Sequence, residues 1–248
     1  MSKVLLITGA SRGIGAETAR LAAERGYSLC LNYRGNHEVA EYLYTSLHGD
    51  GHHVLLHQAD IGVEAEVLAM YQAIDNEFGR LDGLVNNAGI LEGQSDLVDM
   101  SRARWQRILD VNVIGSFLCA REAIKRMSTK SGGQGGSIVN LSSRAAALGA
   151  PHEYIDYAAS KGAVDAMTIG LAKEVAGQGI RVNAVRPGLI YTDIHADSGE
   201  AGRVDRLKSG VPMERGGLPT EVAESILWLL SDASSYTTAS FIDVSGGR

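Results

Sequence analysis

The sequence is poor in cysteine, with only Cys30 and Cys119 among its 248 residues. Two thiols do not make the disulfide framework of a small secreted protein, and neither has the spacing of a metal site. We therefore expect two buried free thiols and no bound metal.

Long hydrophobic runs and a leader segment are also missing. No apolar run approaches the ~20 residues that a membrane-spanning helix needs. The first residues, MSKVLLITGASRG, contain neither a long apolar stretch after a basic start nor a small-residue cleavage site. These absences predict a cytoplasmic protein without a membrane partner.

An excess of basic charge is absent as well. Lys and Arg total 23 against 29 Asp and Glu, so the formal net charge is −6. A mildly acidic chain gains nothing from phosphate backbones, so nucleic acid is not an expected partner. The content of 45% hydrophobic and 21% charged residues is ordinary for a globular protein, and the length suits one undivided α/β domain.

Short apolar runs alternate with helical patterns along the chain. The runs are continuous, as in strands buried on both faces: Val4–Thr8, Ser28–Tyr33, Val54–Gln58, Gly83–Val85, Ser137–Leu141, Arg181–Val185 and Phe241–Val244. The helical patterns between them cover Ile14–Arg25, His37–Leu47, Glu64–Phe78, Arg102–Met127, Tyr157–Ala176 and Glu221–Leu230. Such repetition implies parallel strands with right-handed crossovers. The sequence predicts one α/β domain over residues 1–248, a doubly wound, seven-stranded parallel sheet of the Rossmann type.

Ligands of doubly wound sheets bind beyond the carboxyl ends of the strands, so the residues after each strand form the candidate site. The longest irregular stretch, 187–219, is expected to hold a substrate lid over about 188–217, because long loops in compact domains are usually functional. The side chains expected around the substrate are mixed in charge: Arg144, His152, Glu153, Tyr154, His195 and Arg203. This mixture does not distinguish a hydroxylated sugar from a ketone.

A glycine-rich turn follows the first predicted strand and opens a helix. Its sequence, Thr8-Gly-Ala-Ser-Arg-Gly-Ile-Gly15, has the spacing GxxxGxG. Glycines at Gly9, Gly13 and Gly15 allow a sharp turn and a close approach of the backbone to a pyrophosphate, which the helix N-terminus would face. The position after the first strand favours a dinucleotide site over a simple tight turn.

The end of the second strand bears on the choice between NADP and NAD. An acidic residue there would bind the free ribose hydroxyl of NAD, but this chain has Asn32-Tyr33-Arg34. Arg34 and Arg12 offer guanidinium groups, which pair well with a phosphate. The sequence therefore favours NADP(H) over NAD(H).

Tyr157 and Lys161 stand four residues apart and share one face of a predicted helix. An ammonium group favours a neighbouring phenolate, so we expect Lys161 to lower the pKa of Tyr157 toward neutrality. A tyrosine tuned in this way can donate a proton to a carbonyl oxygen or accept one from an alcohol.

Two further polar groups are candidates for the same site. Ser142 and Ser143 close the fifth strand, where a serine can bind a substrate oxygen, or can simply cap a loop. Asn112 lies inside a long predicted helix, where asparagine is unfavourable; this indicates a local kink or a buried polar role.

Together these residues resemble the short-chain dehydrogenase/reductase family over the whole chain, from Val4 to Gly247. The matching features are TGxxxGIG at the first turn, Asp60-Ile61, Asn86-Asn87-Ala88-Gly89, Asn112, Ser143, the YxxxK of Tyr157–Lys161, and Pro187-Gly188 followed by Thr192. As a set they are far more specific than any one alone.

The resemblance implies an NADP(H)-dependent oxidoreductase and a role for each residue. Tyr157 would be the general acid/base, with Lys161 lowering its pKa and binding the nicotinamide ribose. Ser143 would orient the substrate oxygen, and Asn112 would support a proton relay from Lys161. The remaining cofactor contacts would come from Gly9, Ser11, Arg12, Gly13, Ile14, Gly15, Arg34, Asp60, Ile61, Asn87, Gly89, Pro187, Gly188, Ile190 and Thr192. A homotetramer, paired through Arg102–Met127 and Tyr157–Ala176, is also implied.

One spacing departs from the family pattern. The stretch from Ser143 to Tyr157 is one residue longer than its commonest form, which makes Ser142 a competitor for the catalytic serine. We favour Ser143. Within the family, the chain is most similar to bacterial members labelled glucose 1-dehydrogenase-like or 3-oxoacyl-carrier-protein reductase-like.

Two other functions fit parts of the pattern. A regulator that binds NADPH without turnover could lose Tyr157 or Lys161, yet both are present. A nicotinamide-assisted epimerase or dehydratase would need a larger C-terminal substrate segment. The sequence therefore favours an enzyme that acts on a small carbonyl or alcohol.

Overall fold

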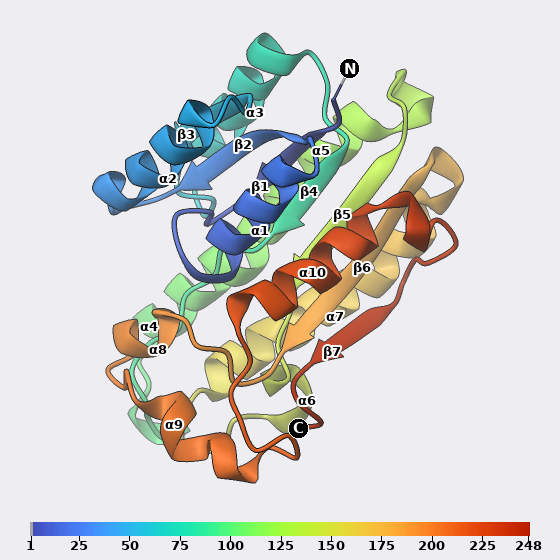
Figure 1. Ribbon diagram of the computed structural model, residues 1–248. Coiled ribbons are helices and arrows are strands. Elements are labelled where there is room, and N and C mark those ends of the chain that lie inside the picture. Colours follow the sequence, from blue (N-terminus) through green and yellow to red (C-terminus); the bar gives the residue numbers. More distant parts are fainter. Residues whose placement is uncertain (1) are drawn as a thin grey trace.

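Seven parallel strands form a single sheet in the computed structural model, which describes residues 2–248. The order is β3-β2-β1-β4-β5-β6-β7, so the chain reverses direction across the sheet between β1 and β4. The strands are β1 (Val4–Ile7), β2 (Ser28–Tyr33), β3 (Val54–Gln58), β4 (Gly83–Asn86), β5 (Gly136–Leu141), β6 (Ile180–Pro187) and β7 (Phe241–Val244). Figure 1 shows the sheet running through the middle of the molecule. The prediction of a doubly wound, seven-stranded parallel sheet is confirmed.

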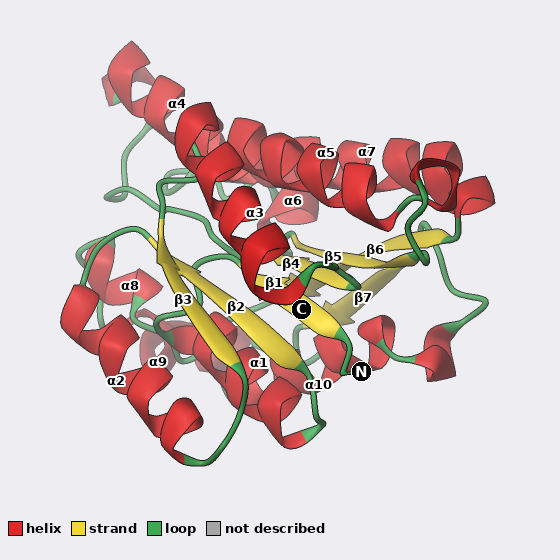
Figure 2. Cartoon of the chain, turned by 90° about the horizontal axis from the view of Figure 1, so that it is seen from above, coloured by secondary structure: helices red, strands yellow, loops and turns green. Residues whose placement is uncertain are grey.

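Helices cover both faces of the sheet (Figure 2). One layer contains α3 (Glu64–Phe78), α4 (Arg102–Leu109), α5 (Ser116–Met127) and α7 (Ile155–Val175); the other contains α1 (Gly13–Glu24), α2 (His37–Gly49) and α10 (Pro219–Leu230). Leu5 and Ile7 pack into the core under α1 and α10, whereas Val4 and Leu6 face the opposite core. Successive side chains of a strand point to opposite faces, which is why buried β1 reads as a continuous apolar run.

The predicted helix Arg102–Met127 is interrupted in the middle. A π-helical turn, η2 (Asp110–Gly115), separates α4 from α5, and Asn112 lies in it fully buried. The expected buried polar position of Asn112 is confirmed, and the regular α-helix is interrupted there by the π turn. Single π turns inside helices are frequent at functional sites, because they redirect a side chain without ending the helix.

The segments beyond the carboxyl ends of the strands contain three short helices that the sequence did not predict. They are α6 (Ala145–Leu148), α8 (Ile194–Asp197) and α9 (Arg203–Leu207). Figure 1 shows α8 and α9, in orange, beyond the sheet at the end where the strand arrows point. Four or five residues are too few to display a helical period, and only tertiary contacts stabilise helices of this length. Among the described residues, no helix is both long enough and apolar enough to cross a membrane.

Candidate active site

A cleft of about 660 Å³ opens at the carboxyl ends of the strands and between the glycine-rich turn and α8. Of the residues predicted for the site, all line this cleft except Gly15 and Asn112, which lie behind it: Gly9, Ser11, Arg12, Gly13, Ile14, Arg34, Asp60, Ile61, Asn87, Gly89, Ser143, Tyr157, Lys161, Pro187, Gly188, Ile190 and Thr192. Residues separated by up to 183 positions, from Gly9 to Thr192, therefore meet in one place. This is the position that a doubly wound sheet gives to its ligand.

The glycine-rich turn is shaped for a close backbone approach. Gly9 has φ of +62°, a left-handed conformation that favours glycine, and a Cβ atom on Gly15 would stand 2.5 Å from the Gly9 carbonyl oxygen. The following helix α1 has no side-chain cap at Arg12 and no acidic residue in its first turn. Its first N–H groups therefore have no competing carboxylate from the first turn of α1 itself, as an anion site requires.

Asn87 fixes the turn to the end of β4. Its amide nitrogen donates to the carbonyl oxygens of Thr8 and Gly9 at 2.8 and 2.9 Å. Further along the edge, Gly188 approaches Ser245 so closely that a Cβ would stand 2.8 Å from its Cα. The backbone around the cleft is thus held by close contacts, and its residues fit a bound dinucleotide.

Both arginines considered for the NADP phosphate line the cleft, and each already faces a carboxylate. Arg12 forms a two-bond ion pair with Asp197 of α8, one bond of which measures 3.2 Å from Nη1 to Oδ1. Arg34 lies 3.8 Å from Asp60, between Nη1 and Oδ2. The side chains of all four residues are 30–47% exposed, so the pairs are accessible to a competing anion.

Tyr157 lies in the first turn of α7 and faces the cleft beside Ser143. Burial raises the pKa of the Tyr157 phenol to about 12, while its hydrogen bond with Ser143 lowers it. The sequence predicted a pKa lowered by Lys161. The structure gives the opposite direction, because the cost of placing a phenolate in a buried position is the dominant effect.

Lys161 is buried one helical turn further along α7. Its ammonium nitrogen lies 5.6 Å from the centre of the Tyr157 ring and donates a 2.6 Å hydrogen bond to the carbonyl oxygen of Leu141. Burial lowers the pKa of Lys161 to about 8, with Asp165 acting in the opposite direction. The site therefore holds a protonated phenol next to an amine that can exchange its proton near neutral pH.

The two serines at the end of β5 have different environments. Ser142 is buried, and its hydroxyl donates to the carbonyl oxygen of Lys161 at 3.3 Å. Ser143 accepts the N–H of Ala145 at 3.1 Å and forms the hydrogen bond with Tyr157. This geometry favours Ser143 as the serine that faces a substrate.

Asn112 lies behind the cleft and joins its two sides. Its Oδ1 accepts the N–H of Ile90 at 2.8 Å, and its Nδ2 donates to the carbonyl oxygen of Ile90 and to the hydroxyl of Ser160, both at 3.0 Å. Ser160 in turn donates to the carbonyl oxygen of Tyr157 at 2.7 Å. Asn112 thus ties the loop after β4 to the turn of α7 that carries Tyr157.

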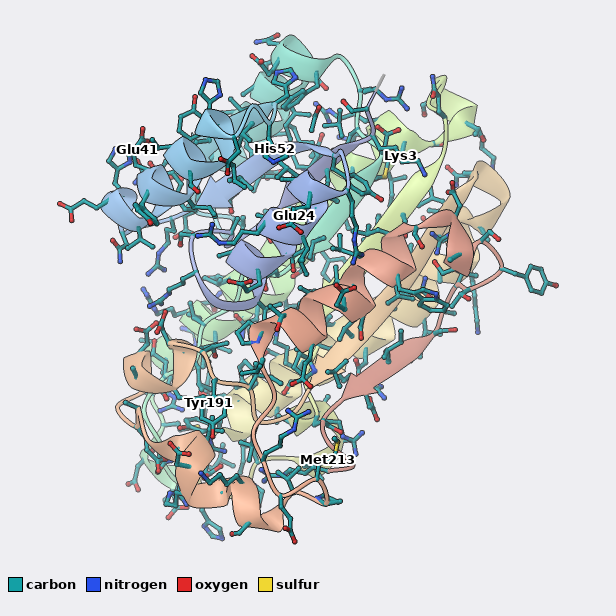
Figure 3. All side chains as sticks on the ribbon, in the orientation of Figure 1. Lys3, Glu24, Glu41, His52, Tyr191 and Met213 are labelled. Atoms are coloured by element: carbon teal, nitrogen blue, oxygen red, sulfur yellow. The ribbon has the colours of Figure 1, made fainter. Side chains whose placement is uncertain are left out.

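The expected lid contains α8 and α9 and is fastened by ion pairs. Arg203, which is almost fully buried, donates to both carboxylate oxygens of Glu153 at 2.8 and 2.6 Å. Tyr191, labelled in Figure 3, donates to Asp205 at 2.9 Å. Two of the charged residues expected around the substrate, Glu153 and Arg203, are therefore paired with each other.

A partly buried ion pair beside the cleft, formed by Arg104 of α4 and Asp156 of α7, was not predicted from the sequence. The two residues are 52 positions apart and belong to no recognisable motif. The only indication in the sequence is that Asp156 directly precedes Tyr157, and this position does not identify Arg104 as its partner.

Comparisons with known proteins agree with this geometry. A family model described as enoyl-(acyl carrier protein) reductase matches residues 9–248. The chain is 54% identical over 245 residues to a protein of Escherichia coli named uncharacterized oxidoreductase YgfF, with 99% of each chain covered. It is 37% identical to a 3-oxoacyl-[acyl-carrier-protein] reductase, FabG, of Staphylococcus aureus, covering all of this chain and 98% of the relative.

A solved structure gives the same result in three dimensions. The crystal structure of a short-chain type dehydrogenase/reductase from Mycobacterium marinum matches with a TM-score of 0.92 and 35% identity, over 99% of this chain and 94% of that chain. The sequence, the fold and these relatives agree on an oxidoreductase that acts on a CH–OH or C=O group. The chain belongs to the short-chain dehydrogenase/reductase family.

Proposed function

We propose that the protein is an NADP(H)-dependent oxidoreductase that transfers hydride between the nicotinamide and a small carbonyl or alcohol substrate, with Tyr157 as general acid/base. The observation that carries this proposal is the convergence of Tyr157, Ser143 and Lys161 in the cleft that the glycine-rich turn also lines. When bound, the nicotinamide supplies or accepts the hydride.

The proton chemistry belongs to the protein. A phenol with a pKa of about 12 remains protonated at neutral pH, so Tyr157 is ready to donate its proton to a carbonyl oxygen as that oxygen gains negative charge. Ser143 orients the same oxygen by a hydrogen bond. In the oxidative direction Tyr157 receives the alcohol proton.

Lys161 and Asn112 are proposed to support Tyr157 from behind. Lys161, with a pKa of about 8, can return a proton to the site at neutral pH, and we propose that it also holds the nicotinamide ribose. Asn112 holds the loop at Ile90 and takes part in the relay toward solvent. The other proposed cofactor contacts are the cleft residues given above, together with Gly15.

The preference for NADP(H) rests on the end of β2 and on the glycine-rich turn. Asn32 and Arg34 stand where a carboxylate would favour NAD(H), and Asn32 is already committed, since its amide donates to the carbonyl oxygen of Ala59 at 2.9 Å. Arg12 and Arg34 are the proposed partners of the 2′-phosphate.

Oxidation of NADPH and NADH over ketones, aldehydes, quinones and acyl thioesters, with sugars and alcohols in the reverse direction, tests the proposal. We expect turnover with NADPH on one of these classes, which would also identify the substrate class. Tight NADPH binding without turnover on any of them would favour a regulator instead. A homotetramer and a cytoplasmic location stay predictions.

A further inference from the structure

Asp156, directly before Tyr157, is a buried carboxylate with a specific partner. Its side chain is only 4% exposed, and that of Arg104 is 15% exposed. The Nε atom of Arg104 donates to Oδ2 of Asp156 at 2.6 Å, and its Nη2 donates to Oδ1 at 3.2 Å. Such a two-bond geometry fixes both the distance and the orientation of the partners.

Asp156 and Arg104 each form a further hydrogen bond to the backbone of a segment at or next to the cleft. Oδ1 of Asp156 accepts the backbone N–H of Tyr157 at 2.9 Å. The remaining Nη1 of Arg104 donates to the carbonyl oxygen of Gly93 at 2.6 Å, a short way beyond the loop residues 88–92 that line the cleft. One guanidinium therefore connects α4, the loop after β4 and the first turn of α7.

We propose that Arg104 and Asp156 are positioning residues that set the place of the Tyr157 ring in the cleft, an inference that rests on the proposed acid/base role of Tyr157. The first N–H groups of a helix have no partner inside the helix, so a first turn is held by side chains. At α7, Asp156 provides that restraint, and Arg104 fixes Asp156 against two other elements.

The position of the pair argues for this role over general stabilisation. Buried ion pairs contribute little net stability on average, because desolvation offsets the attraction. This pair instead bonds the backbone of Tyr157 itself, next to the segment in which the chain departs from the family spacing. That segment has left-handed residues at Ala150 and His152, and it is bound to the loop after β4 by the hydrogen bond from Ser95 N–H to Glu153 O at 3.1 Å.

The test uses two mild variants and a matched control. Arg104→Lys keeps the charge but loses the forked geometry, and Asp156→Glu moves the carboxylate by one methylene. Arg126→Lys is the control, since Arg126 forms a similar two-bond pair with Asp75, at 2.7 and 2.6 Å, between α5 and α3. All three proteins are labelled with carbon-13 at the Cζ atom of tyrosine and measured by NMR with NADPH bound, and Tyr157→Phe identifies the Tyr157 signal among nine tyrosines.

We expect both variants of the ion pair, the clasp variants Arg104→Lys and Asp156→Glu, to change the chemical shift of the Tyr157 Cζ atom. That chemical shift reports the hydrogen bonding of the phenol. The control should leave that signal in place even where it lowers the melting temperature. NADPH affinity should stay unchanged, whereas kcat on the best carbonyl compound of the panel should fall about tenfold or more, since a small misplacement of a catalytic group is costly.

A Tyr157 signal at the wild-type position in both clasp variants would overturn the inference, while leaving the acid/base role intact. Retained turnover in Tyr157→Phe would contradict the proposed function instead. In that case the NMR signal still reports whether the pair positions the ring, so the two failures are distinguishable.

Discussion

At the scale of single residues, burial affects the pKa values of the proposed catalytic pair, Tyr157 and Lys161, more than the neighbouring charge does. The spacing of Tyr157 and Lys161 correctly placed both on one side of α7, but it predicted a lowered pKa for Tyr157, which was wrong. Sequence spacing reports which groups are close, whereas the direction of a pKa also depends on how much water each group retains. That information appears only once the sheet, the lid and α7 enclose the site.

The serine assignment gives a prediction at this scale. Ser143→Ala should lower kcat more than Ser142→Ala, by roughly 10-fold or more, because only Ser143 bonds the Tyr157 phenol. Steady-state rates at saturating NADPH measure this, with circular dichroism as a check on folding. A larger loss of kcat in a folded Ser142→Ala protein would reverse the assignment.

At the scale of elements, the strands and the long helices followed from the sequence, and the connections between them did not. The predicted helix Arg102–Met127 is an example. Its apolar period continues through residues 110–115, so only the unfavourable Asn112 indicated that the helix is irregular there. Helices α8 and α9 lie in the expected lid, where contacts such as Glu153–Arg203 join residues 50 positions apart. Pairings of that kind leave no periodic signal.

The ion pair between Arg12 and Asp197 joins the glycine-rich turn to α8 and leads to a second prediction. If Arg12 binds the 2′-phosphate, it must leave Asp197, so Asp197→Asn should tighten NADPH binding by a few-fold and leave NADH binding unchanged. Fluorescence titration with both nucleotides measures the two dissociation constants. Glu224→Gln is the control, because Glu224 forms a comparably exposed pair with Arg25 at the other end of α1.

An equal effect of Asp197→Asn on both nucleotides would exclude Arg12 as the residue that reads the phosphate. The complementary variant is Arg34→Asp, which replaces a phosphate partner with a ribose acceptor and should shift the preference toward NADH. An unaltered ratio of the two affinities would count against Arg34.

At the scale of the whole molecule, the buried Lys161 lowers the free energy of unfolding at neutral pH. Lys161 has a lower pKa in the folded protein, about 8, than the ordinary 10.5 of an unfolded chain. Below pH 8 folding therefore has to bury a charge, and above pH 10.5 the amine is neutral in both states and this cost disappears. The fold tolerates the cost because the buried lysine is part of the proposed catalytic group.

Lys161→Met should accordingly raise the free energy of unfolding at pH 7, by up to about 3 kcal/mol, while abolishing turnover. Loss of the bond to Leu141 reduces this gain. The gain should shrink as the pH rises from 8 to 10.5, which urea unfolding at pH 7 and pH 10 measures. Lys173→Met, at an exposed position of the same helix, is the control. A variant that is less stable at pH 7 would contradict the assignment of a buried charge.

The predicted homotetramer also belongs to this scale. Leu109, Phe117 and Ile169 are apolar and about 40–47% exposed on α4, α5 and α7, the helices expected to pair between copies. Phe117→Asp should shift the protein toward smaller species in light scattering after size-exclusion chromatography. An unchanged mass would place the interface elsewhere or remove it.

The most direct test of the central claim compares wild type with Tyr157→Phe on the carbonyl class that supports NADPH oxidation. The change removes one hydroxyl from a half-buried ring and leaves the glycine-rich turn, Arg12 and Arg34 intact. We predict that kcat falls by about 10²–10⁴-fold, the usual contribution of a general acid, while the dissociation constant for NADPH stays the same. A Tyr157→Phe protein that binds NADPH and turns over at the wild-type rate would contradict the account.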